Sequence, residues 1–244
     1  MHNLVKVFGN TIAVANLSLS IPHGSFYGVV GPNGAGKTTT LLMATGMLAP
    51  DRGTATVDGI DIWRNPREAK KKLGVMPDGF RLFDRLPGAA LISYMGMIRG
   101  LEKEVAQERA HQLMNALGLA EAGKKLVADY SQGMTKKVAL ACSLVHGPRV
   151  LVLDEPFEAV DPISAAGIRE ILQSFVSGGG TVILSSHVME TVQKLCSHVA
   201  VIDHGRVLAA GATDEVAAGE DLDTRFRHLI GGEHHAEGLE WLQQ

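Results

Sequence analysis

The feature that most constrains this chain is a glycine-rich segment that directly follows a short apolar run. The apolar run spans Phe26 to Val30, and the segment reads Gly31, Pro32, Asn33, Gly34, Ala35, Gly36, Lys37, Thr38. Glycines let the backbone turn so tightly that successive N–H groups point at one anion, beside the positive end of the following helix. The segment fits the phosphate-binding loop between a strand and a helix. In such a loop Lys37 pairs with the β- and γ-phosphates and also acts in catalysis, while the Thr38 hydroxyl binds Mg²⁺; we expect Thr39 to take part in phosphate binding as well.

The same segment has a second interpretation, as a glycine-rich turn that only caps a helix. At average residue usage the pattern arises by accident in about one chain of this length in a hundred. The strand before it and the helix after it make an accident rarer, so phosphate binding is favoured.

An acidic pair ends another apolar run. Val150 to Leu153 reads as a buried strand, and Asp154 and Glu155 follow it at once. Many buried strands end in an acidic residue, so this pattern alone does not indicate a site. Ligands of open α/β sheets bind at the carboxyl ends of strands, where both elements are expected to lie. We therefore expect Asp154 to hold Mg²⁺ and Glu155 to orient or deprotonate the attacking water.

Composition and charge narrow the class of protein. The chain has 244 residues, of which 45% are hydrophobic and 20% charged, with a formal net charge of -3. These values are typical of globular proteins with a sizeable core and do not indicate disorder. The net charge gives no general attraction to nucleic acid or anionic lipid, and we expect no nucleic-acid partner.

The cysteines and the lengths of the apolar segments indicate the cellular compartment in which the chain is expected to work. Cys142 and Cys196 each lie in an apolar stretch and lack the paired spacing of a zinc site, which predicts buried free thiols of a reducing compartment. The first residues contain no signal-peptide core, and no stretch approaches the ~20 apolar residues of a membrane span. Any link to a membrane is expected to go through another subunit.

The remaining pattern predicts an α/β fold: a phosphate-loop nucleoside triphosphatase core with a parallel sheet, an antiparallel β lobe and an inserted α-helical lobe. Apolar and polar residues alternate over 16–21, and again over 54–57 and 60–62 on either side of a turn at 58–59. This alternation indicates the antiparallel lobe. Apolar residues at helical spacing indicate the helical lobe over about 81–145. A hairpin is expected around residues 204–205. The domain is expected to cover residues 1–213, with a polar tail of unassigned structure over 214–244.

Three further segments resemble motifs of the ATP-binding cassette (ABC) family and occur in the same order and position as those motifs. Tyr130-Ser131-Gln132-Gly133-Met134 is similar to the family's signature motif, and Glu158 to Asp161 resembles its loop that crosses between two cassettes. Ser185-Ser186-His187 matches the segment of its switch histidine, and Phe8 stands where the family has an aromatic residue. Taken singly, each has a simpler interpretation as a helix cap, an ordinary polar residue or a core residue. The resemblance covers about residues 4–211.

The resemblance implies an ATPase that works as a pair of cassettes, a homodimer or heterodimer, on a transmembrane permease subunit. Each ATP, with Mg²⁺, would lie between one chain's phosphate loop and the other chain's Ser131 and Gly133, with Asp161 at the interface. His187 would contact the γ-phosphate in catalysis, and Phe8 would stack on adenine. The implied location is the cytoplasmic face of the cell membrane, peripheral through the membrane subunit. Export is the favoured direction.

Two departures from the family pattern matter. Asp78 replaces the family's usual glutamine, which contacts Mg²⁺ and the attacking water, and we expect the Asp78 carboxylate to keep a metal contact with altered coupling. An ionised carboxylate cannot donate a hydrogen bond and adds repulsion near a γ-phosphate. Gln132 and Met134 replace the commoner glycine and glutamine, whereas Ser131 and Gly133 remain.

Three other functions stay in view. A cassette ATPase of translation or chromosome maintenance usually carries two cassettes or a long coiled coil, and this chain has neither. A GTPase switch would carry a guanine-reading Asn-Lys-x-Asp sequence, which is absent. A purely structural module does not explain why Lys37, Asp154, Glu155 and His187 occur together.

Overall fold

The short apolar runs of the sequence become neighbouring strands of one main sheet in the computed structural model, which describes residues 1–79 and 83–231. Its strands are β3 (Phe26–Val30), β7 (Leu73–Met76), β8 (Val150–Asp154), β9 (Thr181–Ser186), β10 (His198–Asp203) and β11 (Arg206–Ala212). They are hydrogen-bonded in the order β11-β10-β3-β9-β8-β7. Every neighbouring pair is parallel except β10 and β11, which form the hairpin predicted around residues 204–205. The predicted α/β class with a parallel sheet is confirmed.

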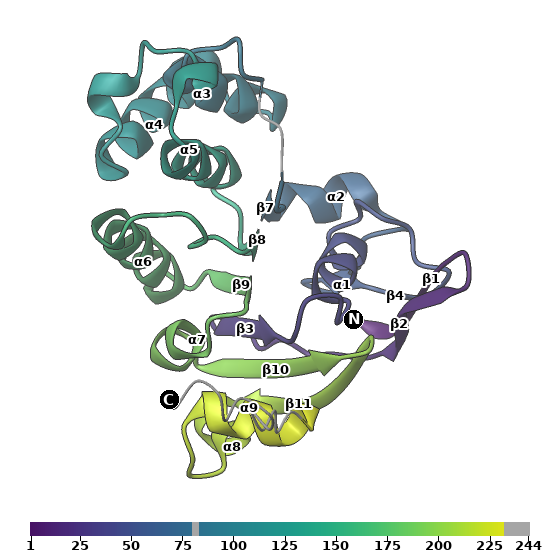
Figure 1. Ribbon diagram of the computed structural model, residues 1–244. Helices are drawn as coiled ribbons and strands as arrows, with labels where there is room; N and C mark the ends of the chain where they lie inside the picture. The colour runs from purple at the N-terminus through teal and green to yellow at the C-terminus, as the bar shows by residue number, and fades with distance from the viewer. Residues whose placement is uncertain (80–82, 232–244) are drawn as a thin grey trace, which may run out of the picture.

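Alternate residues of these strands face two separate cores, because successive side chains of a strand point to opposite faces. On β3, Tyr27 and Val29 join the core that includes α1 (Lys37–Ala44). Phe26 and Val30 join the other, which includes α6 (Pro162–Ser177) and α7 (Met189–Leu195). Helices thus cover both faces of the sheet, as continuous apolar strands require (Figure 1).

An antiparallel lobe lies beside the main sheet. Its strands are β1 (His2–Phe8), β2 (Thr11–Leu17), β4 (Arg52–Thr54), β5 (Thr56–Val57) and β6 (Ile60–Asp61), and α2 (Pro66–Lys71) follows. The pair β5 and β6 turns at residues 58–59 as predicted.

The strand predicted over residues 16–21 is wrong in extent, because β2 ends at Leu17. Leu19 is still buried, which produces the alternation seen in the sequence. Its main chain pairs with that of Met1, at N–O distances of 3.1 and 3.0 Å. The alternation therefore marks burial on one face and not a continued strand.

The helical lobe extends from the β7 edge of the main sheet (Figure 1). It consists of α3 (Gly88–Ile98), α4 (Lys103–Ala116) and α5 (Gln132–Leu144), with short 3-10 turns at Ala120–Ala122 and Val127–Asp129. On α4, the small buried residues Ala106 and Ala110 face the neighbouring helices. The residue at which the lobe was predicted to begin, Arg81, lies outside the described residues. In the part of the chain that is described, no helix combines the length and apolar character needed to cross a membrane.

Two short helices follow β11. They are α8 (Thr213–Ala217) and α9 (Leu222–Ile230), and α9 packs against α7 and α8. The part of the predicted tail that the structure describes therefore contains most of α8 and all of α9, while residues 232–244 lie outside the described residues.

Candidate functional site

The candidate site forms where three strands of the main sheet end side by side. The strands β3, β9 and β8 are consecutive in the sheet, and their register pairs Val30 with Ser186 and Asp154 with Ser185. The glycine-rich segment after β3, the residues after β9 and the acidic pair at the end of β8 consequently meet at one edge. This is the edge at which open α/β sheets bind ligands.

The glycine-rich segment has the tight backbone that its sequence predicts. Gly36 has a φ of 98°, and a Cβ there would come within 2.4 Å of the Ala13 carbonyl oxygen. A Cβ on Gly31 would lie 2.1 Å from the Ile202 carbonyl oxygen. Glycine is therefore required at both ends of the loop, which opens directly into α1.

Lys37 begins α1 and is 8% exposed. Its ammonium donates hydrogen bonds to the carbonyl oxygens of Gly31, at 2.7 Å, and of Pro32, at 3.1 Å. Burial lowers the pKa of Lys37, and the charges of Glu155 and Asp154 oppose that shift. The ammonium thus lies inside the loop, at the place where an anion would enter.

A buried serine holds the acidic pair at the end of β8 through the Asp154 carboxylate and the main chain of Glu155. The Ser185 hydroxyl donates a hydrogen bond to the Asp154 carboxylate and accepts one from the Glu155 N–H, at 3.0 Å. Glu155 has a φ of 48°, in the left-handed region that non-glycine residues seldom adopt. Its carboxylate lies 3.1 Å from Nδ1 of His187, the residue that follows β9. The turn therefore directs Glu155 towards His187.

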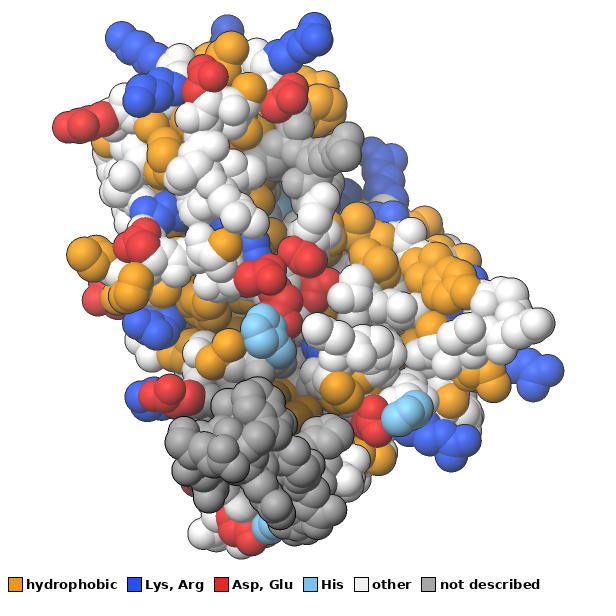
Figure 2. Space-filling view, viewed as in Figure 1, with side chains coloured by type: hydrophobic (Ala, Val, Ile, Leu, Met, Phe, Trp, Pro, Cys, Tyr) orange, Lys and Arg blue, Asp and Glu red, His pale blue; other side chains and the backbone are white. Residues whose placement is uncertain are grey.

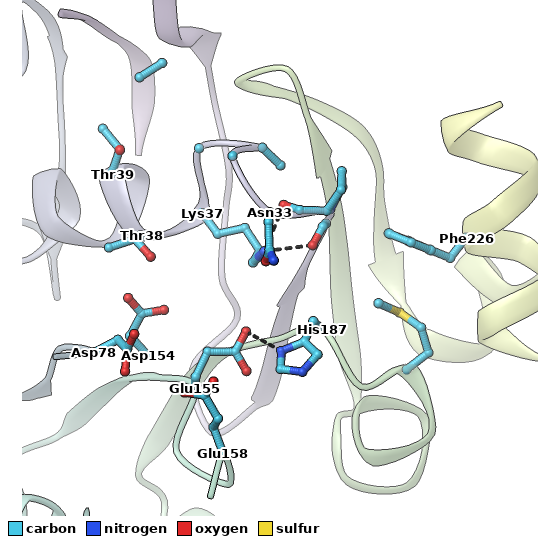
Figure 3. Close-up of a pocket in the computed structure, with 17 residues that line it drawn as sticks. Asn33, Lys37, Thr38, Thr39, Asp78, Asp154, Glu155, Glu158, His187 and Phe226 are labelled. Carbon is cyan, nitrogen blue, oxygen red and sulfur yellow. Dashed lines mark hydrogen bonds and ion pairs between the residues drawn. The ribbon is translucent and has the colours of Figure 1, made fainter. Parts of the chain in front are cut away.

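A cleft of about 560 Å³ contains these groups. Figure 3 shows its carboxylates together on one side, across from Lys37 and Asn33. The cleft is lined by Ala13, Gly31, Pro32, Asn33, Gly34, Ala35, Gly36, Lys37, Thr38, Thr39, Asp78, Asp154, Glu155, Glu158, His187, Met189 and Phe226. The structure thus brings together the whole glycine-rich segment and five of the other expected residues, and it adds Ala13, Glu158, Met189 and Phe226.

Four expected residues do not line this cleft in the described chain. Phe8 ends β1, is 50% exposed, and has the Lys6 ammonium 5.6 Å from its ring centroid. Ser131 caps α5 by accepting a hydrogen bond from the Met134 N–H at 3.3 Å, and Gly133 lies in the first turn of that helix. Asp161 caps α6 in the same way, through Ser164 N–H at 3.0 Å. The helix-cap interpretations of Ser131 and Asp161 therefore hold within a single chain.

Lys136 is a charged residue near the site that the sequence did not single out. It lies on α5, and its ammonium donates to the Glu155 carbonyl oxygen at 2.7 Å. The same ammonium lies 3.2 Å from the Glu158 carboxylate and 3.9 Å from that of Asp78. No motif could have indicated it, because its partners come from two other segments of the chain.

The oxygen ligands expected for Mg²⁺ lie in the same cleft. Thr38, Asp154 and Asp78 all line it, and hydroxyl and carboxylate oxygens suit this ion. Among the described residues, no group of three or more His, Cys, Asp or Glu side chains could hold a metal by itself. The donor set therefore fits an ion that completes its coordination with phosphate and water oxygens, as Mg²⁺ does in nucleotide sites.

A parallel sheet, a glycine-rich loop leading into a helix with a buried lysine, and carboxylates on the neighbouring strand end define a phosphate-loop nucleoside triphosphatase. Comparison with known proteins specifies the class further. The family model described as ABC transporter matches residues 14–158. This chain therefore belongs to the ABC transporter family, and the resemblance read from its motifs is confirmed.

The relatives include ATP-binding proteins named for resistance and export. The daunorubicin/doxorubicin resistance ATP-binding protein DrrA of Streptomyces peucetius is 39% identical over 87% of this chain, which spans 64% of that relative's length. The linearmycin resistance ATP-binding protein LnrL of Bacillus subtilis is 33% identical over 96% of this chain and 76% of the relative. The fold matches a solved ATP-binding subunit of an ABC transporter with a TM-score of 0.87, at 24% identity over 94% of this chain and 98% of the other.

Proposed function

We propose that this chain binds and hydrolyses ATP and powers export through a separate transmembrane permease subunit. The observation that carries the proposal is the pair of Glu155 and His187, 3.1 Å apart, facing Lys37 across the cleft of the glycine-rich loop. The names of the relatives support export, since they include a Nod factor export ATP-binding protein of Cupriavidus metallidurans, 36% identical over 90% of this chain and 73% of the relative.

The glycine-rich loop would hold the phosphates of ATP. Its backbone N–H groups and the start of α1 favour an anion. The Lys37 ammonium, now bonded to two carbonyl oxygens of its own loop, would turn to the β- and γ-phosphates. Thr38 and Asp154 would hold Mg²⁺, with Asp78 as a third oxygen donor, and the ion would neutralise phosphate charge when bound.

Glu155 is the residue proposed to prepare the water for attack. Its carboxylate would accept a hydrogen bond from a water in line with the γ-phosphate. His187, whose Nδ1 lies 3.1 Å from the Glu155 carboxylate, would contact the γ-phosphate and hold the same water. Lys37 would stabilise the negative charge that spreads over the γ-phosphate in the transition state.

The proposal includes a second cassette. Ser131, Gly133 and Asp161 lie outside the cleft within one chain, and Ser131 and Gly133 stand at the N-terminus of α5, where phosphate binds favourably. They would therefore complete the site of a neighbouring cassette, in a homodimer or heterodimer. Phe8, half exposed at the end of β1, would stack on adenine. The pair would work at the cytoplasmic face of the cell membrane, bound there through the permease.

Glu155→Gln is the variant that tests this proposal. It keeps the size and hydrogen-bonding reach of the side chain but removes the carboxylate, so ATP hydrolysis should fall at least about a hundredfold. ATP binding should remain, and a dimer should accumulate with MgATP, observed by light scattering. The matched control is Glu190→Gln on α7, where the exposed Glu190 pairs with Lys194; it should hydrolyse ATP as the unmodified chain does. Wild-type hydrolysis by Glu155→Gln would contradict the assigned role.

A further inference from the structure

Lys136 joins the helical lobe to the two segments that carry the acidic side of the cleft. Its side chain is 14% exposed although it ends in a charge. The ammonium has three partners: the Glu155 carbonyl oxygen at 2.7 Å, Glu158 Oε2 at 3.2 Å and Asp78 Oδ1 at 3.9 Å. The first two contacts are hydrogen bonds, and the third is an ion pair without a hydrogen bond.

The main-chain contact acts on the residue proposed to prepare the water. Glu155 holds a φ of 48°, and its N–H is fixed by Ser185 on β9. Lys136 binds the carbonyl oxygen on the other side of the same residue. Both peptide groups of Glu155 are therefore tied down, one by the sheet and one by the helical lobe. A residue in an uncommon conformation persists only when its surroundings fix it in this way.

The side-chain contacts of Lys136 place a positive charge beside carboxylates of the cleft. Asp78, Asp154, Glu155 and Glu158 all line the cleft, and the acidic side chains gather in the middle of the face shown in Figure 2. A nucleotide triphosphate would add further negative charge at this place. Lys37 lines the cleft, whereas Lys136 contacts Asp78 and Glu158 and does not line the cleft. An opposite charge within about 4 Å is the usual means of holding such carboxylates together.

We propose that Lys136 is a positioning residue for ATP hydrolysis, which fixes the Glu155 main chain and offsets the charge of Asp78 and Glu158. The inference rests on the proposed ATPase function. It also gives the carboxylate of Asp78 a role that an uncharged glutamine could not fill, because only a carboxylate forms an ion pair with Lys136. The orientation of the helical lobe would then act directly on Glu155 through one side chain.

Lys136→Met tests the proposal, because methionine keeps the length of the aliphatic chain and removes the ammonium. The turnover number for ATP is expected to fall about tenfold, while KM for ATP changes less than about twofold, since Lys136 does not touch the phosphate loop. Lys136→Arg should restore turnover to within about threefold of the unmodified chain. The matched control is Lys71→Met, which removes an exposed lysine paired with Glu68 on α2 and should leave turnover and KM unchanged.

Asp78→Asn separates the charge role of Lys136 from its main-chain role. If Lys136 also offsets the Asp78 charge, Lys136→Met should cost less in the Asp78→Asn chain than the tenfold it costs alone, while the loss that comes from the Glu155 main-chain contact remains in both chains. Equal costs in the two chains would overturn the charge role of Lys136, and no rescue by arginine or unchanged turnover in Lys136→Met would overturn the inference as a whole. If the unmodified chain hydrolyses ATP and Glu155→Gln does not, those results bear on Lys136 alone. If the unmodified chain does not hydrolyse ATP, the proposed function fails and the inference fails with it.

Discussion

His146 is a titratable residue whose surroundings oppose its charged form. It follows α5, and its Nε2 donates to the Leu73 carbonyl oxygen at 3.0 Å, while its buried Nδ1 has no hydrogen-bond partner within the described chain. Burial lowers the pKa of His146 to about 4; the positive charge of Arg99 and, less strongly, that of Arg109 add to this, while the bond to Leu73 opposes it. The imidazole is therefore neutral in the folded protein at neutral pH.

The low pKa of His146 leads to a pH-dependent stability. The unfolded chain binds a proton at His146 as the pH falls below about 6.5, whereas the folded chain does so only near pH 4. Between these values the unfolded state holds more protons, so this residue lowers stability as the pH falls, by up to about 1.4 kcal/mol per pH unit. Urea unfolding of the unmodified chain and of His146→Gln between pH 7 and pH 5 measures how the free energy of unfolding changes with pH. The variant should lose less stability over that range, and equal slopes would contradict the assignment.

The backbone conformation of Glu155 determines where its carboxylate lies in the site. A left-handed conformation costs a non-glycine residue roughly 1–2 kcal/mol. The Ser185 hydroxyl and the Lys136 ammonium bind its two peptide groups and hold that conformation. The carboxylate is then directed at His187, as Figure 3 shows.

At the scale of elements, the contact between β7 and α5 depends on the absence of one side chain. A Cβ on Gly74 would lie 2.1 Å from the Ser143 carbonyl oxygen and 2.6 Å from a Leu151 methyl group. Strand β7 therefore lies too close to the last turn of α5 to leave room for a side chain at residue 74. This contact places α5, and with it Lys136, against the acidic side of the cleft.

The same substitution at two glycines should have opposite effects. Gly74→Ala is expected to lower the free energy of unfolding by about 1–3 kcal/mol, because helix or strand must move. Gly167→Ala, within α6, meets no atom within 4 Å. It should raise stability by about 0.5–1 kcal/mol, because alanine loses less backbone entropy in a helix. Thermal and urea unfolding measure both, and destabilisation by Gly167→Ala or tolerance of Gly74→Ala would refute the packing argument.

Sequence could predict the elements whose signal is local. The run Phe26–Val30 is apolar throughout because both faces of β3 are covered, and the loop after it needs glycines for its own backbone. The extent of β2 could not be predicted, because burial of Leu19 continues the alternating pattern where strand pairing has stopped.

The site residues likewise fall into those that the sequence could predict and those that it could not. The cleft residues that follow β3 and β9 or lie at the end of β8 could be predicted, because the apolar runs of the sequence show where these strands end. Lys136 and Phe226 could not be predicted, because each reaches the site from a helix whose orientation depends on tertiary packing. Figure 3 shows Phe226 extending from its helix towards the cleft.

For the whole molecule, the two parts of the proposed site cannot meet within one chain as it stands. The glycine-rich loop lines the cleft, whereas Ser131 and Gly133 lie at the start of α5, outside it. Gly133 is partly exposed, and a Cβ there would make only an ordinary contact, 3.5 Å from the Ala159 carbonyl oxygen. A larger residue at Gly133 should therefore leave the folded chain intact and act only on a partner.

This arrangement gives a complementation test, in which every chain carries Glu155→Gln so that ATP is retained. Lys37→Ala removes the phosphate ligand of a chain's own loop, and Gly133→Arg blocks the surface it offers to its neighbour. Each variant alone should remain monomeric with MgATP, because both of its paired sites would be damaged. In a mixed pair both defects fall in the same site and the other site is intact. Equal amounts mixed should therefore yield dimers by sedimentation. If the mixture stays monomeric while the parent Glu155→Gln chain dimerises, the head-to-tail arrangement is wrong.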